Sequence, residues 1–449
     1  MVAAKLAYRI LRLLGRSASH YPGWIALKLC PTYLSVVPKC QLTICVTGTN
    51  GKTTVTNLIS DVLVSNKFSV STNRIGSNIA PGVATALTNA VSWRGRPVCD
   101  ACVLEVDERA SRLILPAVKP DYLVVTNLFR DSLKRNANPA FMRDLIEAHT
   151  PDGTTLVLNA DDLCSSTLCA DRPNRRVFFG MDQLPGDATT PADNIVTDHT
   201  ACPVCHAQLV WRVRRYHHIG RAVCPGCGYA SHAADYELVA VDVPTIAVRH
   251  GEVVVTYPLI NDTMFNVYNE LTAIATLCEV GLTPQQIGVS LTSLAVVDSR
   301  MNETSIGPVR VVMAMSKGQS CVSTSRTLDF VRQEPGRKAV MLVMDDWYDR
   351  RHSVEYIGWI YDADFEFLKD ETVVQVLACG PRCYDYQLRL LVAGIDQSRI
   401  TCCEDELAAP RSLKLDNLDA VFILYDTSTI HRAAELKQKT LDELRKVYS

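Results

Sequence analysis

The stretch Cys45–Thr54, CVTGTNGKTT, constrains the fold of this 449-residue chain more than any other feature. It follows the apolar run QLTICV (41–46), which predicts a buried strand, and it leads into TVTNLISDVLVSNKF (54–68), whose apolar residues recur at helical spacing. A glycine turn between a strand and a helix lets successive backbone N–H groups converge on phosphate at the positive end of the helix. The stretch therefore predicts a phosphate-binding loop in an α/β domain.

The residues of this loop have different predicted roles. The candidates for nucleotide binding are Gly48, Asn50, Gly51, Lys52, Thr53 and Thr54. Lys52 supplies a point charge, and the hydroxyl of Thr53 is placed to ligate magnesium. The generic phosphate-loop pattern is not matched, because Val46 stands where that pattern has its first glycine. An ordinary strand-to-helix turn is the alternative interpretation.

Apolar runs that predict strands alternate with helical stretches along most of the chain. They lie at 98–106, 121–127 and 154–162, and again at 310–316, 338–346, 372–380 and 420–426. Such alternation indicates a parallel sheet whose ligands collect at the carboxyl ends of the strands. The polar stretch 296–308 separates the two sets. We predict an N-terminal helical segment (1–40), a central ATP-binding domain (41–305) and a smaller C-terminal α/β domain (306–449).

The N-terminal segment contains AYRILRLLGR (7–16), in which basic residues interrupt apolar residues at helical spacing. A basic amphipathic helix can lie on an anionic membrane. It can equally pack on the domain that follows, which is the commoner case. The next stretch, YPGWIALKLCP (21–31), is interrupted by Pro22 and Gly23.

The bulk composition excludes several classes of function. Lys and Arg number 46 against 48 Asp and Glu, giving a net charge of -2, so no overall basic field favours nucleic acid. No apolar run reaches the roughly 18 residues of a membrane span, and no secretory signal begins the chain. We therefore expect a cytoplasmic protein with reduced cysteines, among which Cys30, Cys45, Cys102 and Cys278 are expected to be buried hydrophobes.

Two cysteine pairs form a separate pattern within the central domain. CPVC (Cys202, Cys205) and CPGC (Cys224, Cys227) are Cys-x-x-Cys knuckles with 18 residues between them, in an insertion at about 197–235. Four thiolates at this spacing are typical of structural zinc, and glycines at 226 and 228 suit the tight turns around the metal. The nearby histidines (His206, His217, His218, His232) are surplus to a four-cysteine site.

The loop TGTNGKTT resembles that of the Mur ligase and folylpolyglutamate synthetase superfamily. These enzymes use ATP to activate a carboxylate as an acyl phosphate, which an amine then attacks. The resemblance implies that a carboxylate in VLEVDE holds magnesium; Glu105 is favoured over Glu108. It also implies that Asn266, in MFNVYNELTAIA, lies beside the adenine, although an asparagine there is often only a helix cap.

The loop and the ribbon together resemble the MurT family, the synthetase subunits of lipid II isoglutaminyl synthase. The resemblance extends over most of the chain through four further segments, which are LLGR…PGWIALKLCP, TNLFRD (126–131), WIYDADFE (359–366) and CGPRCYDYQLRLLVAG (379–394). It implies ATP, Mg²⁺ and structural Zn²⁺ as cofactors and a GatD-type glutaminase as partner. The implied reaction is amidation of the α-carboxylate of D-glutamate in lipid II, at the inner face of the membrane.

The sequence departs from this family in places. The family carries an aspartate that orients the catalytic histidine of the partner. The matching segment here, MDDWYDRRHSVEYIGWIYDADFE, holds extra residues. Asp349 is the best match for that aspartate, and Asp346 and Glu355 are alternatives. The family's Gly-Arg pair near the ATP phosphates is Ser299-Arg300 here, and its Lys-Asn-Pro segment is Ser316-Lys317-Gly318. Arg300 and Lys317 keep the charge.

Two other functions remain open from the sequence. The first is a ligase that joins an amino acid, rather than ammonia, to a carboxylate. The second is a zinc-ribbon ATPase that binds nucleic acid through WRVRRYHH (211–218), which is basic and aromatic. The net negative charge of the chain favours an insertion held together by structural zinc over this second function, so we predict no nucleic-acid partner.

Overall fold

The structure is a computed structural model that divides into two compact units. It describes residues 1–74, 76–131, 138–181, 183–184, 187, 194–298, 303–316, 319–344 and 357–448, with the backbone alone for 295–298. The larger unit comprises 1–129, 138–192 and 197–298, and the smaller unit comprises 130–137, 193–196 and 299–449. Each unit is built on its own sheet.

The sheet of the larger unit has nine strands among the described residues, in the order β11-β10-β9-β6-β5-β4-β1-β3-β2. Its parallel part consists of β1 (Leu42–Thr47), β2 (Val70–Thr72), β3 (Ala101–Glu105), β4 (Tyr122–Val125), β5 (Thr155–Asn159), β6 (Arg176–Met181) and β9 (Tyr236–Asp242). The predicted parallel α/β arrangement is therefore confirmed. β1 lies between β3 and β4, so the segments that follow these three strands share one edge of the sheet.

The far edge of this sheet differs from the expected alternation. β10 (Thr245–His250) and β11 (Val253–Pro258) continue the sheet from β9 as antiparallel neighbours. Antiparallel neighbours need only short connections, and β11 is exposed at half of its positions, as suits an edge strand with one face toward solvent. Alternation of strands with helices does not predict such a pair, because no helix separates its two strands.

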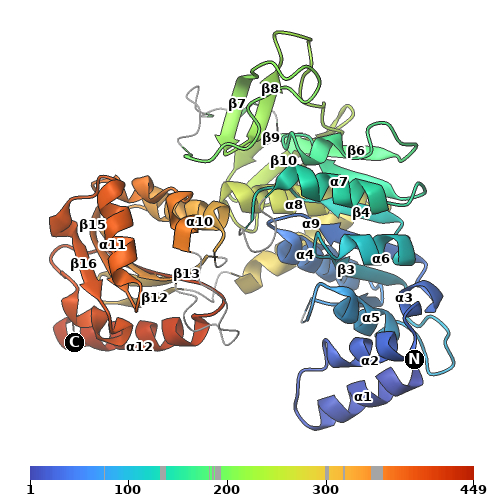
Figure 1. Ribbon diagram of the computed structural model, residues 1–449, viewed down its shortest axis with the longest axis horizontal. Helices are drawn as coiled ribbons and strands as arrows, with labels where there is room; N and C mark the ends of the chain where they lie inside the picture. Colours follow the sequence, from blue (N-terminus) through green and yellow to red (C-terminus); the bar gives the residue numbers. More distant parts are fainter. Residues whose placement is uncertain are drawn as a thin grey trace. The chain divides into compact units, whose positions relative to one another are not determined.

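Helices cover both faces of the larger sheet (Figure 1). They are α1 (Val2–Leu13), α2 (Tyr21–Leu29), α3 (Tyr33–Val36), α4 (Lys52–Ser65), α5 (Ala80–Asn89), α6 (Ser111–Val118), α7 (Pro139–His149), α8 (Met264–Glu279) and α9 (Pro284–Asp298), with a 3₁₀ turn at Ser165–Thr167. The stretch interrupted by Pro22 and Gly23 is helix α2. Proline is well placed in a first helical turn. Gly23 permits close packing on α5, because a Cβ there would lie 1.8 Å from the carbonyl oxygen of Pro81.

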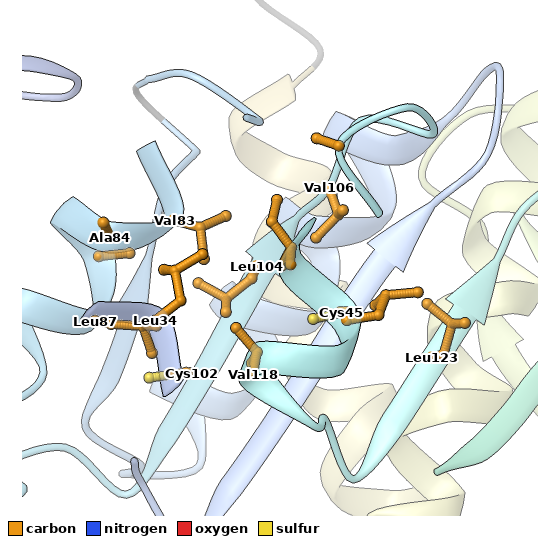
Figure 2. Close-up of a cluster of buried hydrophobic side chains, with 14 of the residues drawn as sticks. Leu34, Cys45, Val83, Ala84, Leu87, Cys102, Leu104, Val106, Val118 and Leu123 are labelled. Atoms are coloured by element: carbon orange, nitrogen blue, oxygen red, sulfur yellow. The ribbon is translucent and has the colours of Figure 1, made fainter. Parts of the chain in front are cut away.

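A continuous apolar core joins this sheet to α3, α5 and α6. Figure 2 shows Cys45 and Cys102 among aliphatic side chains such as Leu104 and Val83. Burial raises the pKa of the Cys45 thiol to about 12, so it packs as a small hydrophobe. By contrast, Cys30 and Cys278 are only half-buried.

The cysteine-rich insertion, which lies between β6 and β9 along the chain, forms its own small sheet. β7 (Val210–Tyr216) and β8 (Ile219–Val223) pair as an antiparallel hairpin that does not join the nine-stranded sheet (Figure 1). A small apolar cluster of Leu163, Leu209 and Ala222 packs with the cysteines. The side chain of Leu163 connects the insertion to the segment after β5.

The smaller unit has a six-stranded sheet among its described residues, in the order β12-β13-β17-β14-β15-β16. The strands are β12 (Glu303–Ile306), β13 (Val309–Met315), β14 (Lys338–Val343), β15 (Val373–Cys379), β16 (Ile400–Cys403) and β17 (Ala420–Tyr425). The helices are α10 (Cys321–Gln333), α11 (Cys383–Val392) and α12 (Ile430–Tyr448), with 3₁₀ turns at Ile357–Tyr361, Phe365–Lys369, Gln397–Arg399 and Glu406–Ser412. All pairs but β12–β13 are parallel, which confirms the predicted C-terminal α/β domain. No helix in the described part of the chain is long and apolar enough to cross a membrane.

Candidate functional site

The predicted phosphate loop lies between the end of β1 and the start of α4. Gly48 and Gly51 have φ angles of +124° and +86°, which L side chains rarely adopt. A Cβ at Gly48 would lie 2.3 Å from Oγ1 of Thr126, and one at Gly51 would lie 2.1 Å from Oδ1 of Asn269. Both glycines are therefore required by backbone conformation and by space.

The segment after β4 forms a wall that holds the loop in place. The backbone N–H of Thr49 donates to the carbonyl of Asn127 at 2.8 Å, and that of Asn50 donates to Oδ1 of Asn127 at 3.0 Å. Oγ1 of Thr126 donates to the carbonyl of Asn50 at 2.6 Å. The buried side-chain Nδ2 of Asn50 has no hydrogen-bond partner among the described residues, so one donor in the loop is left for a ligand.

One ion pair and one hydroxyl–carboxylate hydrogen bond lie at the start of α4. The ammonium of Lys52, which is 7 % exposed, donates to the loop carbonyls of Gly48 and Thr49 and to Oε1 of Glu108 at 3.3 Å. Oγ1 of Thr53 donates to Oε2 of Glu105 at 2.8 Å. The structure thus brings together Thr53 and Glu105, the residues expected to hold magnesium, and gives Glu108 a different partner. A hydroxyl and a carboxylate at one edge of the phosphate loop suit a hard cation that prefers oxygen ligands.

Helix α8 contributes two asparagines on the opposite side of the loop. Nδ2 of Asn266 donates to Oγ1 of Thr263 at 2.8 Å, and Nδ2 of Asn269 donates to Oδ1 of Asn266 at 3.3 Å. Asn269 is the residue that meets Gly51. Sequence reasoning selected Asn266 and missed Asn269, although their spacing of three residues places both on one face of a helix.

The four predicted zinc cysteines come together. The sulfur atoms of Cys202, Cys205, Cys224 and Cys227 all lie within 4.8 Å of one another. The two knuckles have matching turns. The N–H of His206 donates to the carbonyl of Cys202 and that of Gly228 to the carbonyl of Cys224, both at 3.0 Å, and both donor residues have positive φ angles. Four cysteines with no further ligand among the residues that the structure describes form a closed site that fits structural zinc.

A buried chain of contacts connects the ribbon hairpin to the phosphate loop. Nε2 of His218 lies 3.2 Å from Oδ1 of Asp162, and Oδ2 of Asp162 accepts the N–H of Leu128 at 2.7 Å. The N–H of Phe129 in turn donates to Oγ1 of Thr49 at 2.9 Å. The rings of Phe129 and His218 are also in contact, with centroids 4.4 Å apart. Three contacts thus lead from the ribbon to the loop.

The pKa values of the groups along this series of contacts depend on His218. Asp162 and His218 are fully buried. Burial acts to raise the pKa of Asp162, but the hydrogen bond and charge of His218 bring it below its ordinary value. Neighbouring His199 has its pKa lowered to about 4 by burial and by the charge of His218. Of the histidines that are surplus to the zinc site, His218 therefore contacts the segment that supports the phosphate loop.

Two basic residues of the ribbon face inward. Arg215 is 3 % exposed and lies 2.7 Å from Asp187, and Arg221 lies 2.7 Å from Asp161. The hydroxyl of Tyr268 on α8 donates to the same Asp161 at 2.6 Å. These arginines satisfy buried carboxylates and do not form a surface for nucleic acid.

Several predicted site residues lie outside the described residues. They are Arg300, Lys317, Asp346, Asp349 and Glu355. Their roles remain predictions.

Comparison with known proteins gives two family matches. Residues 46–207 match the Mur ligase middle domain, and residues 319–429 match the MurT ligase C-terminal domain. The chain is 30 % identical over 397 residues to the lipid II isoglutaminyl synthase (glutamine-hydrolyzing) subunit MurT of Staphylococcus aureus, covering 88 % of this chain and 87 % of that one. It is 28 % identical to the subunit of that name from Streptococcus pneumoniae, covering 89 % and 88 % of the two chains.

Solved structures show the same fold at lower identity. A pseudomurein peptide ligase type C from Methanothermus fervidus has a TM-score of 0.66 and 18 % identity, covering 90 % of this chain and 79 % of its own. The MurF ligase from Thermotoga maritima in complex with ADP has a TM-score of 0.59 and 15 % identity, covering 95 % and 85 %.

Proposed function

Because the chain belongs to the MurT family, as its sequence predicted, we propose that it is the synthetase subunit of a lipid II amidotransferase. The observation that carries this proposal is a Mur-type phosphate loop and a four-cysteine cluster in one unit of a chain that matches MurT relatives over 88 % of its length. The chain is accordingly an ATP-dependent ligase. The acceptor we propose is the α-carboxylate of D-glutamate in the stem peptide, which becomes D-isoglutamine.

The residues of the loop support a mechanism in which ATP activates the carboxylate. The backbone N–H groups at the start of α4 and the side chain of Asn50 bind the phosphates, and Lys52 offsets their charge. Thr53 and Glu105 would hold a magnesium ion, which would offset the negative charge of the phosphates. The carboxylate takes the γ-phosphoryl group and becomes an acyl phosphate. Ammonia then attacks the carbonyl carbon and expels phosphate, which forms the amide.

The nitrogen source we propose is a GatD-type glutaminase. The S. aureus relative is named as a subunit of a glutamine-hydrolyzing synthase. Glutamine hydrolysis needs a cysteine nucleophile with a histidine base, and we assign that pair to the partner. Asp349 is proposed to orient the partner's histidine, with Asp346 and Glu355 as alternatives. Since lipid II is membrane-bound, the complex would work at the inner face of the membrane.

The test is mass spectrometry of lipid II incubated with this protein, ATP and magnesium, with ammonium or with a GatD-type partner and glutamine as the nitrogen source. A carboxyl-to-amide mass change is expected with either source, and Lys52→Met provides the matched inactive control. Absence of the change with an ATP-binding protein and its cognate partner would contradict the proposal. Turnover with an amino acid and without any glutaminase would instead identify an amino-acid ligase.

A further inference from the structure

Helix α1 leaves one apolar face uncovered. The helix packs on α2 and α5 through its opposite face, where Ala4 is fully buried. Val2, Leu6, Ile10 and Leu13 recur at intervals of three or four residues and are 53 %, 50 %, 55 % and 87 % exposed. In Figure 1 the helix lies at the margin of its unit, beyond α2. A row of exposed large apolar side chains of this kind marks a surface for an apolar ligand or partner.

A cavity of about 540 Å³ opens beside the same helix. Tyr8 and Arg12 of α1, Arg16 and Ser19 of the loop that follows, and Arg74 after β2 are among the residues that line it. The charges in this cavity have one sign, because no aspartate or glutamate is among its described lining residues. Arginine with neighbouring hydroxyl groups is the combination that recognises phosphate.

The arginines that line the cavity differ in whether their side chains have an ion-pair partner. Arg74 pairs with Asp61, which is outside the cavity. The side chains of Arg12 and Arg16 make no ion pair or hydrogen bond with any described residue, and both residues are exposed. By contrast, Lys5 and Arg9 on the neighbouring part of the helix lie over the ring of Trp93. Two guanidinium groups are therefore available to an anion.

The cavity is connected to the phosphate site through Asn73, which also lines it. Nδ2 of Asn73 donates to the carbonyl of Glu105 at 2.9 Å, and Oδ1 of Asn73 accepts the N–H of Glu105 at 2.8 Å. Glu105 is the proposed magnesium ligand. Asn73 thus lines the cavity and also holds the backbone of Glu105, which suits a substrate with an anionic group in the cavity and its acceptor carboxylate at the phosphate loop.

We propose that this cavity binds the diphosphate of a prenyl-diphosphate-linked substrate, with the exposed face of α1 against the first part of the prenyl chain. The inference rests on the proposed function for the identity of the acceptor carboxylate. Arg12 and Arg16 bind the diphosphate, and Val2, Leu6 and Ile10 contact the chain. The sugar and the short peptide of the substrate then extend past Asn73 to the phosphate loop.

Binding is tested with farnesyl diphosphate as the probe, using calorimetry on the full chain saturated with magnesium and a non-hydrolysable ATP analogue so that the phosphate loop is filled. Arg12→Gln/Arg16→Gln is expected to weaken binding about tenfold or more, because two charge-assisted contacts are lost. Arg94→Gln/Arg96→Gln removes the same charge from two exposed arginines outside the cavity and is expected to bind like the wild type. Equal affinity in all three proteins, or equal loss in both variants, would overturn the proposal.

Two further probes distinguish the sources of phosphate and of affinity. Farnesol is expected to bind more weakly than farnesyl diphosphate in the wild type and equally in both variants. Dihexanoyl-phosphatidylglycerol represents a membrane headgroup. If it bound as tightly as farnesyl diphosphate and with the same dependence on Arg12 and Arg16, the cavity would be a membrane-surface site and the proposal would be wrong.

Activity separates this inference from the proposed function. With the glutaminase partner and glutamine, Arg12→Gln/Arg16→Gln is expected to raise KM for lipid II about tenfold with kcat unchanged, and to leave turnover of a diphosphate-free muropeptide unaffected. An equal KM increase for both substrates would contradict a diphosphate site. If the wild type amidates neither substrate but the arginines still control farnesyl diphosphate binding, the proposed function fails and the diphosphate site stands.

Discussion

The ion pair of Lys52 and Glu108 predicts that loss of the loop lysine affects both turnover and stability. The side chains are 8 % and 2 % exposed, and the charged atoms lie 3.3 Å apart. Lys52→Met removes the cation and leaves the carboxylate of Glu108 buried without a charged partner. Breaking a buried pair from one side destabilises a protein by about 3–5 kcal/mol. We take the lower figure, because the pair adjoins a ligand-binding loop that water can enter.

The second substitution restores stability without restoring activity. In Lys52→Met/Glu108→Gln the buried group is neutral, so most of the destabilisation is expected to disappear, leaving about 1 kcal/mol for the lost hydrogen bonds to loop carbonyls. With a urea m-value of about 3 kcal/mol/M, the single variant should unfold about 1 M earlier than the wild type and the double variant about 0.3 M earlier. Neither variant is expected to turn over ATP, since both lack the phosphate charge.

The assay is urea unfolding followed by tryptophan fluorescence and far-ultraviolet circular dichroism, alongside phosphate release from ATP. Both probes are needed because two units are present and they can unfold separately. Full ATP turnover in Lys52→Met would refute the phosphate-loop assignment. Equal midpoints for the single and double variants would refute the buried ion pair, whatever the activity.

Three other predictions concern separate parts of the larger unit. Gly51→Ala is expected to abolish ATP binding in a titration, because its Cβ would lie 2.1 Å from Oδ1 of Asn269 at a φ of +86°; normal affinity would show that the loop adapts. Cys224→Ser is expected to lose zinc by metal analysis and to weaken ATP binding about tenfold, because the ribbon supports the loop wall; retained zinc would contradict the four-cysteine site. Burial raises the pKa of Glu270 from 4.5 to about 7, so the folded state binds its proton more tightly and this contribution to stability declines as pH rises from about 4.5 to 7. Glu270→Gln is therefore expected to be more stable than the wild type by about 3 kcal/mol at pH 8 and equal to it at pH 4 in denaturant unfolding; a constant difference would exclude this titration.

The features that the sequence predicted are those whose chemistry depends on residues close together in the sequence. The phosphate loop works through consecutive N–H groups, and each zinc knuckle is closed by one short turn, so both leave a contiguous pattern. The parallel strands were predicted because they are apolar on both faces and alternate with helices. β10 and β11 form an antiparallel hairpin at the edge with no helix between them, so the alternation of strands with helices does not indicate them.

The residues that the sequence did not predict act across the fold. Asn269 is significant because it meets Gly51, which lies more than 200 positions earlier in the chain. Asn127 was part of a segment used only to identify the family, yet it supplies two acceptors to the loop. Such pairings depend on which strands become neighbours, and strand order cannot be read from the periodicity of a single strand.

The position of His218 gives the ribbon a role beyond its own stability. A ribbon that served only as a staple would need no fully buried polar connection to its host domain, since apolar contacts such as those of Leu163 suffice and avoid the desolvation of charge. Here a buried aspartate accepts from the ribbon histidine on one side and from the wall of the phosphate loop on the other. Because the ribbon and the loop wall both bond to this one buried carboxylate, they are expected to keep their geometry together. Zinc bound at the ribbon would therefore help to fix the segment that supports the predicted phosphate loop.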